Sequence, residues 1–226
     1  MLRAGINLSN FLLVTGSDPV SGDPVGVSPA LATHLAHRLQ LPVKLITYPG
    51  PGPLADDIDN WDIGNIANET ERAKTIQFSS AYCNILATYL VPKDSKITTI
   101  DDVDRAGVRI VTKARSAYDL WLTENIKQAT IVRFKSVDDC FTEFCNSGYE
   151  VLSGLKPKLM DEAKKLPGSR ILDGNFTVIG QSVGCRKNIP EAAEFIDKCV
   201  QELVADGTID SWIDQYGVTG KLAAAV

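Results

Sequence analysis

Short apolar runs alternate along this chain with longer stretches in which apolar residues recur every three or four positions. The short runs predict strands, and the longer stretches predict amphipathic helices. The expected strands lie at 2–6, 42–46, 61–66, 81–91, 108–111, 130–134, 149–152, 169–172 and 176–183. The expected helices begin at Ser28, Leu54, Thr99, Ser116, Ser136, Lys156 and Pro190, and a last helix carries Ile209 to Tyr216. This alternation is typical of an α/β fold with parallel sheets built from βαβ units.

Residues at several predicted helix starts agree with this interpretation. Ser28 precedes Pro29, and a serine cap followed by proline at the first helical position is a favoured start. The spacing in this helix predicts a buried stripe of Leu31, Ala32, Leu35, Ala36 and Leu39. A capping-box spacing, with aspartate three positions later, occurs at Thr99, Ser116 and Ser136. The polar segment 17–24 predicts a surface loop or a small hairpin.

Two apolar strands, near residues 91 and 184, are expected to carry the chain from one lobe into another and back. This predicts a discontinuous first lobe, residues 1–90 plus 185–226, and an inserted second lobe, residues 91–184. A chain of 226 residues is long enough for one large domain or for two small lobes.

The composition is that of an ordinary globular protein and disfavours several functional classes. Hydrophobic residues make up 44% of the chain and charged residues 23%, so a packed core is expected. The net charge of -5 is spread along the sequence, which argues against a nucleic-acid partner or an anionic membrane surface. No apolar run approaches the roughly 18–20 residues needed to span a bilayer.

The cysteines and histidines do not form the pattern of a metal site. The five cysteines are an odd number and lack CxxC spacing, so free thiols in or near the core are expected. The two histidines, His34 and His37, lie in one predicted helix, where a surface or boundary position is expected for both. We therefore expect neither a metal nor a cofactor.

The segment from Gly26 to Val91 has a recognisable order of features. Gly-Val-Ser-Pro-Ala at 26–30 and the strand at 42–46 come first, followed by Trp-Asp-Ile-Gly-Asn-Ile at 61–66, Glu-Arg-Ala at 71–73, Ile-Gln-Phe-Ser-Ser-Ala-Tyr at 76–82 and the strand at 87–91. This order resembles the amino-acid-binding group of ABC-transporter solute-binding proteins (bacterial extracellular solute-binding protein family 3), which have the periplasmic binding protein type II fold. The resemblance extends from Leu2 to Gly220 and implies two Rossmann-like lobes, mixed but mainly parallel sheets, and a two-strand hinge. It also implies that a solute is bound in an interlobe cleft by hinge closure.

Polar residues follow the first predicted strand, where ligands of open parallel sheets are usually bound. Asn7, Ser9 and Asn10 can donate and accept hydrogen bonds toward a polar ligand. The alternative is a turn capped by its own asparagine side chains.

The resemblance gives a specific role to Arg72, in the segment after the strand that ends at Ile66. In the family, an arginine in this place pairs with the ligand's α-carboxylate, and a planar guanidinium makes two parallel bonds to such a group. The alternative is a surface arginine that neutralises Glu69 or Glu71. Ala67 and Asn68 lie where family members present backbone groups to the ligand.

Tyr82 occupies the aromatic position of the family's Phe-(Ser/Thr)-x-Pro-Tyr motif, although Ala81 stands in place of the usual proline. Asn84, two residues later, is a candidate to face the cleft. A tyrosine buried in the core is an equally good interpretation of Tyr82.

The second lobe is expected to contribute the start of a helix. Ser116 and Ala117 would offer backbone amides to a carboxylate, and Tyr118 would form a wall of the pocket. Gln181, on the strand returning to the first lobe, is a further candidate contact.

Ser153 and Gly154 stand where many amino-acid-binding relatives have an aspartate that binds the ligand's ammonium group. Without that carboxylate, a buried ammonium lacks a counter-charge, which is costly. An ordinary α-amino acid is therefore disfavoured but not excluded, and a carboxylate-bearing or neutral polar solute is favoured.

The sequence contains no Gly-x-Ser-x-Gly, P-loop or HExxH motif, so we expect a binding protein and not an enzyme. Some relatives of this fold are dehydratase- or lyase-like enzymes that use a cleft carboxylate, and the nearest candidates for that role are Glu69 and Glu150. A ligand-sensing module is a further alternative.

The first residues enter a predicted strand at once and lack the pattern of a signal peptide. A periplasmic or extracellular location is therefore expected if a leader was removed, and a cytoplasmic one otherwise. The expected partners are a small-molecule ligand and, in the exported case, an ABC permease. The chain can be a monomer or a dimer.

Overall fold

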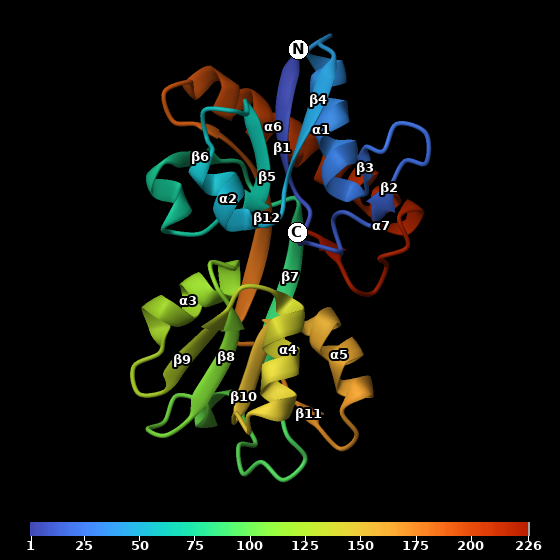
Figure 1. Ribbon diagram of the computed structural model, residues 1–226. Helices are drawn as coiled ribbons and strands as arrows, with labels where there is room; N and C mark the ends of the chain where they lie inside the picture. Colours follow the sequence, from blue (N-terminus) through green and yellow to red (C-terminus); the bar gives the residue numbers. More distant parts are fainter. Residues whose placement is uncertain (226) are drawn as a thin grey trace. The chain divides into compact units, whose positions relative to one another are not determined.

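The computed structural model describes residues 1–225, which form two compact units (Figure 1). Unit 1 consists of Met1–Asn84 and the segment that starts at Gly180, and unit 2 is the continuous segment Ile85–Ile179. The strands β7 (Cys83–Val91) and β12 (Thr177–Arg186) each pass from one unit into the other. The expected boundaries, 90/91 and 184/185, lie in the same strands but several residues further along, because a continuous strand has no turn to mark the change of unit.

Unit 1 is built on a mixed sheet. β1 (Leu2–Asn7) lies between β4 (Val43–Tyr48) and β5 (Ile63–Ala67) and is parallel to both. β12 pairs antiparallel with β5, and β6 (Ile76–Phe78) pairs antiparallel with β12. The remaining strands are β13 (Ala223–Ala224), which pairs with the start of β7, and β2 (Gly16–Ser17) with β3 (Pro24–Val25), which make the segment 17–24 a small hairpin. The helices are α1 (Val27–Arg38), α2 (Pro51–Asp56), η1 (Arg72–Lys74), α6 (Pro190–Ala205) and α7 (Thr208–Gln215).

Trp61 fills one face of the unit 1 sheet. Its ring lies against two strand glycines, and a Cβ added to Gly5 or Gly64 would come within 3.2 and 3.1 Å of the indole. Its Nε1 donates a hydrogen bond of 3.0 Å to the carbonyl of Leu54 in α2, so the buried indole has a partner. Glycine at these two strand positions is therefore explained by the close approach of the ring.

The start of α1 differs from the expected one. The helix begins at Val27, and Gly26 is the N-cap with φ 145° and ψ -174°, a conformation that favours glycine. Ser28 does not cap the helix; its Oγ lies 2.8 Å from the hydroxyl of Tyr82. The expected stripe of apolar residues is buried except for Leu39, which follows the last turn and is 41% exposed.

Unit 2 contains the other part of the same mixed sheet, with helices around it (Figure 1). β8 (Arg109–Lys113) is parallel to both β9 (Thr130–Phe134) and β10 (Val151–Leu155), while β10 and β11 (Arg170–Ile171) are antiparallel to β7. The helices are η2 (Ile100–Asp102), α3 (Ala117–Asn125), α4 (Val137–Asn146) and α5 (Lys156–Lys165). One core cluster surrounds Tyr89, Ile110 and Leu122, and a second surrounds Val111, Phe144 and Leu159.

The three N-caps predicted in unit 2 are present, and one of them, at Thr99, has the full reciprocal capping box. Ser116 and Ser136 are the N-caps of α3 and α4, and their hydroxyls accept from the backbone N–H groups of Asp119 and Asp139 at 3.1 and 3.0 Å. Thr99 and Asp102 form the reciprocal box of η2. Because this motif is local, four consecutive residues suffice to predict it.

An arginine binds an acidic residue at the amino end of the parallel strands in each unit. In unit 1, Asp62 accepts from the backbone N–H of Arg3 at 2.9 Å and from its guanidinium Nε and Nη2 at 3.2 and 2.7 Å. In unit 2, Glu150 accepts from the same three groups of Arg109 at 2.9, 2.9 and 2.8 Å. We call these two pairs the arginine clamps.

The cysteines are all free, and four of the five are buried. Within residues 1–225, no helix combines the length and the apolar character needed to cross a bilayer.

Candidate functional site

The loop after β1 contains three of the predicted ligand-binding residues. The Asn7 side-chain oxygen accepts from the backbone N–H and the hydroxyl of Ser9, at 3.1 and 2.8 Å. The Asn10 oxygen accepts from the backbone N–H of Leu12 at 3.3 Å, and Asn10 is buried. Both asparagines therefore shape this turn, which agrees with the alternative interpretation of the segment.

Unit 1 also brings the end of β5 together with β12. Gln181 is paired across the strands with Ala67, and its side-chain oxygen lies 3.5 Å from Asn10 Nδ2. The backbone N–H of Asn68 donates to the carbonyl of Gly180 at 3.1 Å, and the Asn68 side chain is exposed. The predicted residues of β1, β5 and β12 are thus neighbours at one edge of this sheet.

Arg72, at the start of η1, lies at the same edge. The residue is only 5% exposed, and its Nη1 donates to the carbonyl of Ala67 at 3.0 Å. A buried guanidinium needs partners for its donors, and this bond fixes it at the carboxyl end of β5. The side chain is buried and does not lie on the surface, and Glu71 forms an ion pair with Lys74.

Tyr82 belongs to the core of unit 1. Its side chain is fully buried, its hydroxyl is bound to Ser28, and burial raises the pKa of the phenol. A ligand cannot reach this side chain, so the prediction that Tyr82 contacts the ligand is corrected in favour of the core interpretation. Asn84 is half-buried and lies beside Gly180.

In unit 2 the predicted residues gather at the start of α3. The backbone N–H of Ser116 donates to the carbonyl of Lys113 at 3.3 Å, so this amide is occupied, contrary to expectation. The Ala117 amide lies in the first turn, where the helix itself supplies no acceptor. Tyr118 is buried, and burial raises the pKa of its phenol, so it offers little surface for a pocket wall.

A charged network surrounds this helix start. The Asp119 carboxylate accepts from the backbone N–H of Arg115 at 2.7 Å and from Arg133 Nε at 2.8 Å, and Asp119 is buried. Arg115 has φ 60°, a left-handed conformation that is strained for a residue with a side chain. These contacts hold the loop before α3 in one conformation.

Ser153 and Gly154 lie on β10, beside the end of β8. The Ser153 hydroxyl donates to the carbonyl of Val111 at 3.0 Å, and a Cβ on Gly154 would come within 3.1 Å of Leu159. Both residues thus serve the packing of unit 2. Their contact with a ligand stays a prediction.

The comparisons with known proteins bear on what these two edges do. The family model of bacterial extracellular solute-binding proteins, family 3, matches residues 16–219. The chain belongs to this family. A curated relative, the glutamine-binding protein of Geobacillus stearothermophilus, is 26% identical over 125 residues, a match that covers 55% of this chain and 47% of the relative.

Solved structures of similar fold agree with the expected fold class of this family 3 chain, the periplasmic binding protein type II fold. A putative ABC-transporter binding component from Wolinella succinogenes in complex with lysine has a TM-score of 0.78 at 18% identity, with 97% of each chain covered. A mutant of the T. maritima protein ArgBP has a TM-score of 0.75 at 22% identity, covering 96% of this chain and 95% of that one. An ancestral amino-acid-binding protein, described as a precursor of cyclohexadienyl dehydratase, has a TM-score of 0.74 at 23% identity, with 95% of this chain and 94% of that one covered.

Several residues of this family 3 chain were not singled out from the sequence. Lys113 is a buried cation at the carboxyl end of β8, and Asp119 is buried beside it at the helix start. Lys113 could have been noticed from the sequence, because it is a charged residue at the end of an apolar strand. The link between Asp119 and Arg133 joins two elements and has no local signature.

Asn65, in the middle of β5, was also missed. It is 2% exposed, and among the described residues neither its amide nitrogen nor its oxygen has a hydrogen-bond partner. Within residues 1–225, no group of three or more histidine, cysteine, aspartate or glutamate residues is placed to hold a metal ion.

Proposed function

We propose that this family 3 protein binds a small carboxylate-bearing solute, and that Arg72 binds the carboxylate. The observation that carries the proposal is the buried guanidinium at the carboxyl end of β5, oriented by the carbonyl of Ala67. A planar guanidinium held in this way can make charge-assisted, parallel bonds to a carboxylate at little further cost in side-chain entropy.

The start of α3 is the proposed contribution of unit 2. The first-turn amide of Ala117 and the positive end of the helix dipole favour an anionic or strongly polar group of the solute. The Asp119 network supports this role by keeping the loop at residue 115 in one conformation. As the family resemblance implies, we propose hinge closure, in which contacts from both units to one solute stabilise the closed form.

The charges on β10 favour a solute that does not depend on an ammonium group. Ser153 is neutral, and Glu150 is engaged by Arg109, whose hydrogen bonds lower the pKa of the glutamate. One similar protein is named for glutamine, and two others were solved with arginine or lysine, so amino acids belong in any test. We infer that this chain tolerates removal of the ammonium group better than removal of the carboxylate.

Delivery of the solute to an ABC permease, outside the cytoplasm, is the proposed biological role. It rests on the family description, which is of extracellular solute-binding proteins. We propose binding without catalysis, although one structural neighbour is described as a precursor of a dehydratase. Glu150, one of the two carboxylates considered for such a reaction, is held by three donors of Arg109, and its lowered pKa makes it a poor proton donor near neutral pH.

The proposal is tested by calorimetric titration of the whole chain with L-glutamine, L-arginine, L-lysine and L-glutamate. For glutamine the panel also includes 4-carbamoylbutanoate, which keeps the carboxylate and lacks the ammonium, and L-glutaminamide, which has the reverse. We expect the carboxylate-bearing member of this pair to bind more tightly. Mass spectrometry of each mixture after incubation checks that the solute is unchanged.

Arg72→Ala should weaken the binding of the best solute by about a hundredfold, because it removes a buried charge-assisted contact. Arg72→Lys should restore part of the loss, since it keeps the charge without the planar pair of donors. Arg38→Ala is the matched control, because Arg38 forms an exposed ion pair with Glu202 elsewhere in unit 1. Unchanged affinity in folded Arg72→Ala would remove this residue, and the proposal, from consideration.

A further inference from the structure

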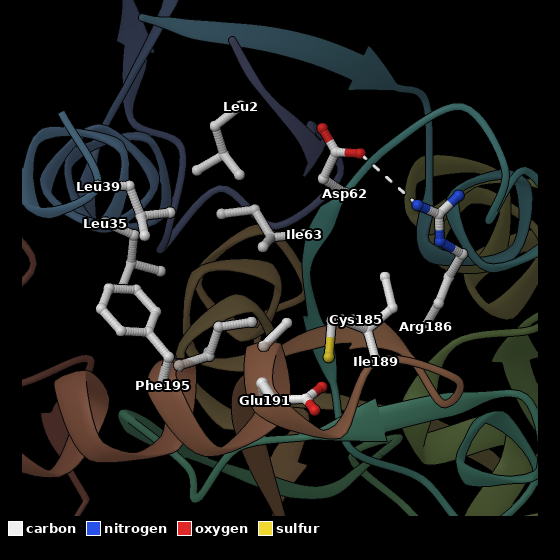
Figure 2. A pocket seen from close by; sticks show the side chains of 12 residues that line it. Leu2, Leu35, Leu39, Asp62, Ile63, Cys185, Arg186, Ile189, Glu191 and Phe195 are labelled. Atoms are coloured by element: carbon white, nitrogen blue, oxygen red, sulfur yellow. Dashed lines mark ion pairs between the residues drawn. The ribbon is translucent and has the colours of Figure 1, made fainter. Parts of the chain in front are cut away.

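Unit 1 contains a pocket at the amino end of its parallel strands, at the opposite end of β5 from Arg72 (Figure 2). It is lined by Leu2 and Ile63 at the starts of β1 and β5, by the end of β12, and by residues of α1 and α6. Ile63 and Ala67 are four residues apart, which places this pocket about 13 Å along the strand from the proposed carboxylate site. It is therefore a separate cavity within the same unit.

The pocket is concave and mainly apolar. Its volume is about 370 Å³, within the range of small-molecule sites. Leucine and isoleucine side chains from both helices and their ends line it. Two of them remain partly exposed to solvent, Leu39 at 41% and Ile189 at 37%. A hydrophobic occupant would remove this apolar surface from water, which is the favourable term in its binding.

The charges at the rim are unequally engaged. Asp62 is bound by three donors of Arg3, whereas the nearest contact between Arg186 and Asp62 is 3.9 Å, too long for a hydrogen bond. In residues 1–225 the Arg186 guanidinium makes no side-chain hydrogen bond, and Figure 2 shows it at the rim beside Asp62. Glu191 also lines the pocket, but it is exposed and lies in the first turn of α6, where the helix dipole stabilises its charge.

We propose that this pocket is a second ligand site, which takes a small apolar monocarboxylate with its hydrocarbon part on the leucine and isoleucine walls and its carboxylate on Arg186. The guanidinium suits this group because it can bind a carboxylate through two parallel hydrogen bonds. Glu191 repels a carboxylate on its own side of the pocket and so directs the head group to Arg186. A neutral amide gains a weaker hydrogen bond from Arg186 than a carboxylate does, and an ammonium group is repelled by it.

The test is methyl-resolved NMR and calorimetric titration of the whole chain with octanoate, octanamide and octylamine. We expect octanoate to shift the methyl signals of Leu2, Leu35 and Ile63 and to bind about tenfold more tightly than octanamide. Arg186→Gln should abolish this preference while changing the affinity for octanamide much less. Lys187→Gln, the same charge change at an exposed neighbour, should leave it intact.

A second pair of variants tests the cavity itself. Ala192→Phe fills the pocket and should abolish binding of octanoate, while Ala193→Phe, one residue along α6 and outside the pocket lining, should not. Solute binding that depends on Arg72 should persist in Ala192→Phe, which separates the two sites. Shifts confined to other methyl groups, equal affinity for the three probes, or an unchanged preference in Arg186→Gln would overturn the proposal.

Discussion

The two units fasten the amino ends of their parallel strands in the same way but build the opposite edges differently. Asp62 and Glu150 each receive the backbone N–H and two guanidinium donors of the arginine on the neighbouring strand, Arg3 and Arg109. Both carboxyl edges bury a cation, Arg72 in unit 1 and Lys113 in unit 2, but only unit 2 places a helix start capped by a side chain, at Ser116, directly after it.

The helices α1 and α3, the first α-helix of each unit, show the contrast most clearly. The start of α1 is packed into the core, with Gly26 against Leu13 and the Ser28 hydroxyl bound to Tyr82. The start of α3 is instead held by the side chains of Ser116 and Asp119. A helix end used for packing is closed to a solute, so under the proposed function unit 1 supplies a side chain, Arg72, where unit 2 offers the first-turn amide of α3.

The largest expected effect comes from the start of α1. Gly26→Ala would place a Cβ 2.3 Å from the carbonyl oxygen of Leu13 at a φ that only glycine tolerates, and should lower the free energy of unfolding by about 3 kcal/mol or more. Gly22→Ala is the matched control, because Gly22 also has positive φ but nothing within 4 Å, and should cost about 1 kcal/mol. Urea denaturation measures both, and equal losses would show that the packing of α1 is not what requires Gly26.

The start of α3 should respond to a change of charge rather than of shape. Asp119→Asn replaces one acceptor with a donor that faces the Arg115 amide or Arg133, and should cost about 2 kcal/mol. It should also weaken solute binding, measured by calorimetry, because the loop before the helix loses its anchor. Asp138→Asn, in the exposed first turn of α4, is the control and should change neither quantity appreciably. A stable Asp119→Asn with full affinity would contradict the supporting role of the network.

Equivalent strand positions, three residues beyond each clamp acid, should give effects of opposite sign. Asn65 is buried without a partner in the described chain, so Asn65→Leu, of similar shape, should stabilise the protein by about 1 kcal/mol. The Ser153 hydroxyl is bonded to Val111, so Ser153→Ala should destabilise it by about 1 kcal/mol. Thermal unfolding of the two variants measures the sign of each stability change. Destabilisation by Asn65→Leu would indicate that the amide has a role in the folded chain.

The smallest effect should be the pH dependence of the clamps, where the two units are expected to agree. Hydrogen bonds from Arg3 and Arg109 lower the pKa values of Asp62 and Glu150. The stabilisation is complete above the ordinary carboxyl pKa values, about 4, and is lost as the pH falls through the lowered values. Asp62→Asn and Glu150→Gln should therefore each make the free energy of unfolding less dependent on pH below about pH 4.5, and an unchanged profile in either variant would argue against that clamp.

Sequence patterns predict the features of this fold that depend on neighbours in the chain. The serine N-caps at Ser116 and Ser136 each depend on four consecutive residues and were predicted correctly. The start of α1 was misplaced because its position depends on the contact between Gly26 and Leu13, and the same lack of local signal hid the arginine clamps. Tyr82 matched a family motif, yet its environment is set by the packing of Ser28 against it.

Unit 2 is one continuous insertion into unit 1. The two segments of unit 1 that flank the insertion are hydrogen-bonded neighbours. Tyr82 N donates to the carbonyl of Gln181 at 2.8 Å, and Asn68 N donates to that of Gly180 at 3.1 Å. These bonds belong to unit 1 alone, so they survive when residues 85–179 are exchanged for the corresponding segment of a relative. The boundaries at residues 84/85 and 179/180 are therefore suitable junctions for chimeras in which unit 2 is exchanged while unit 1 is kept.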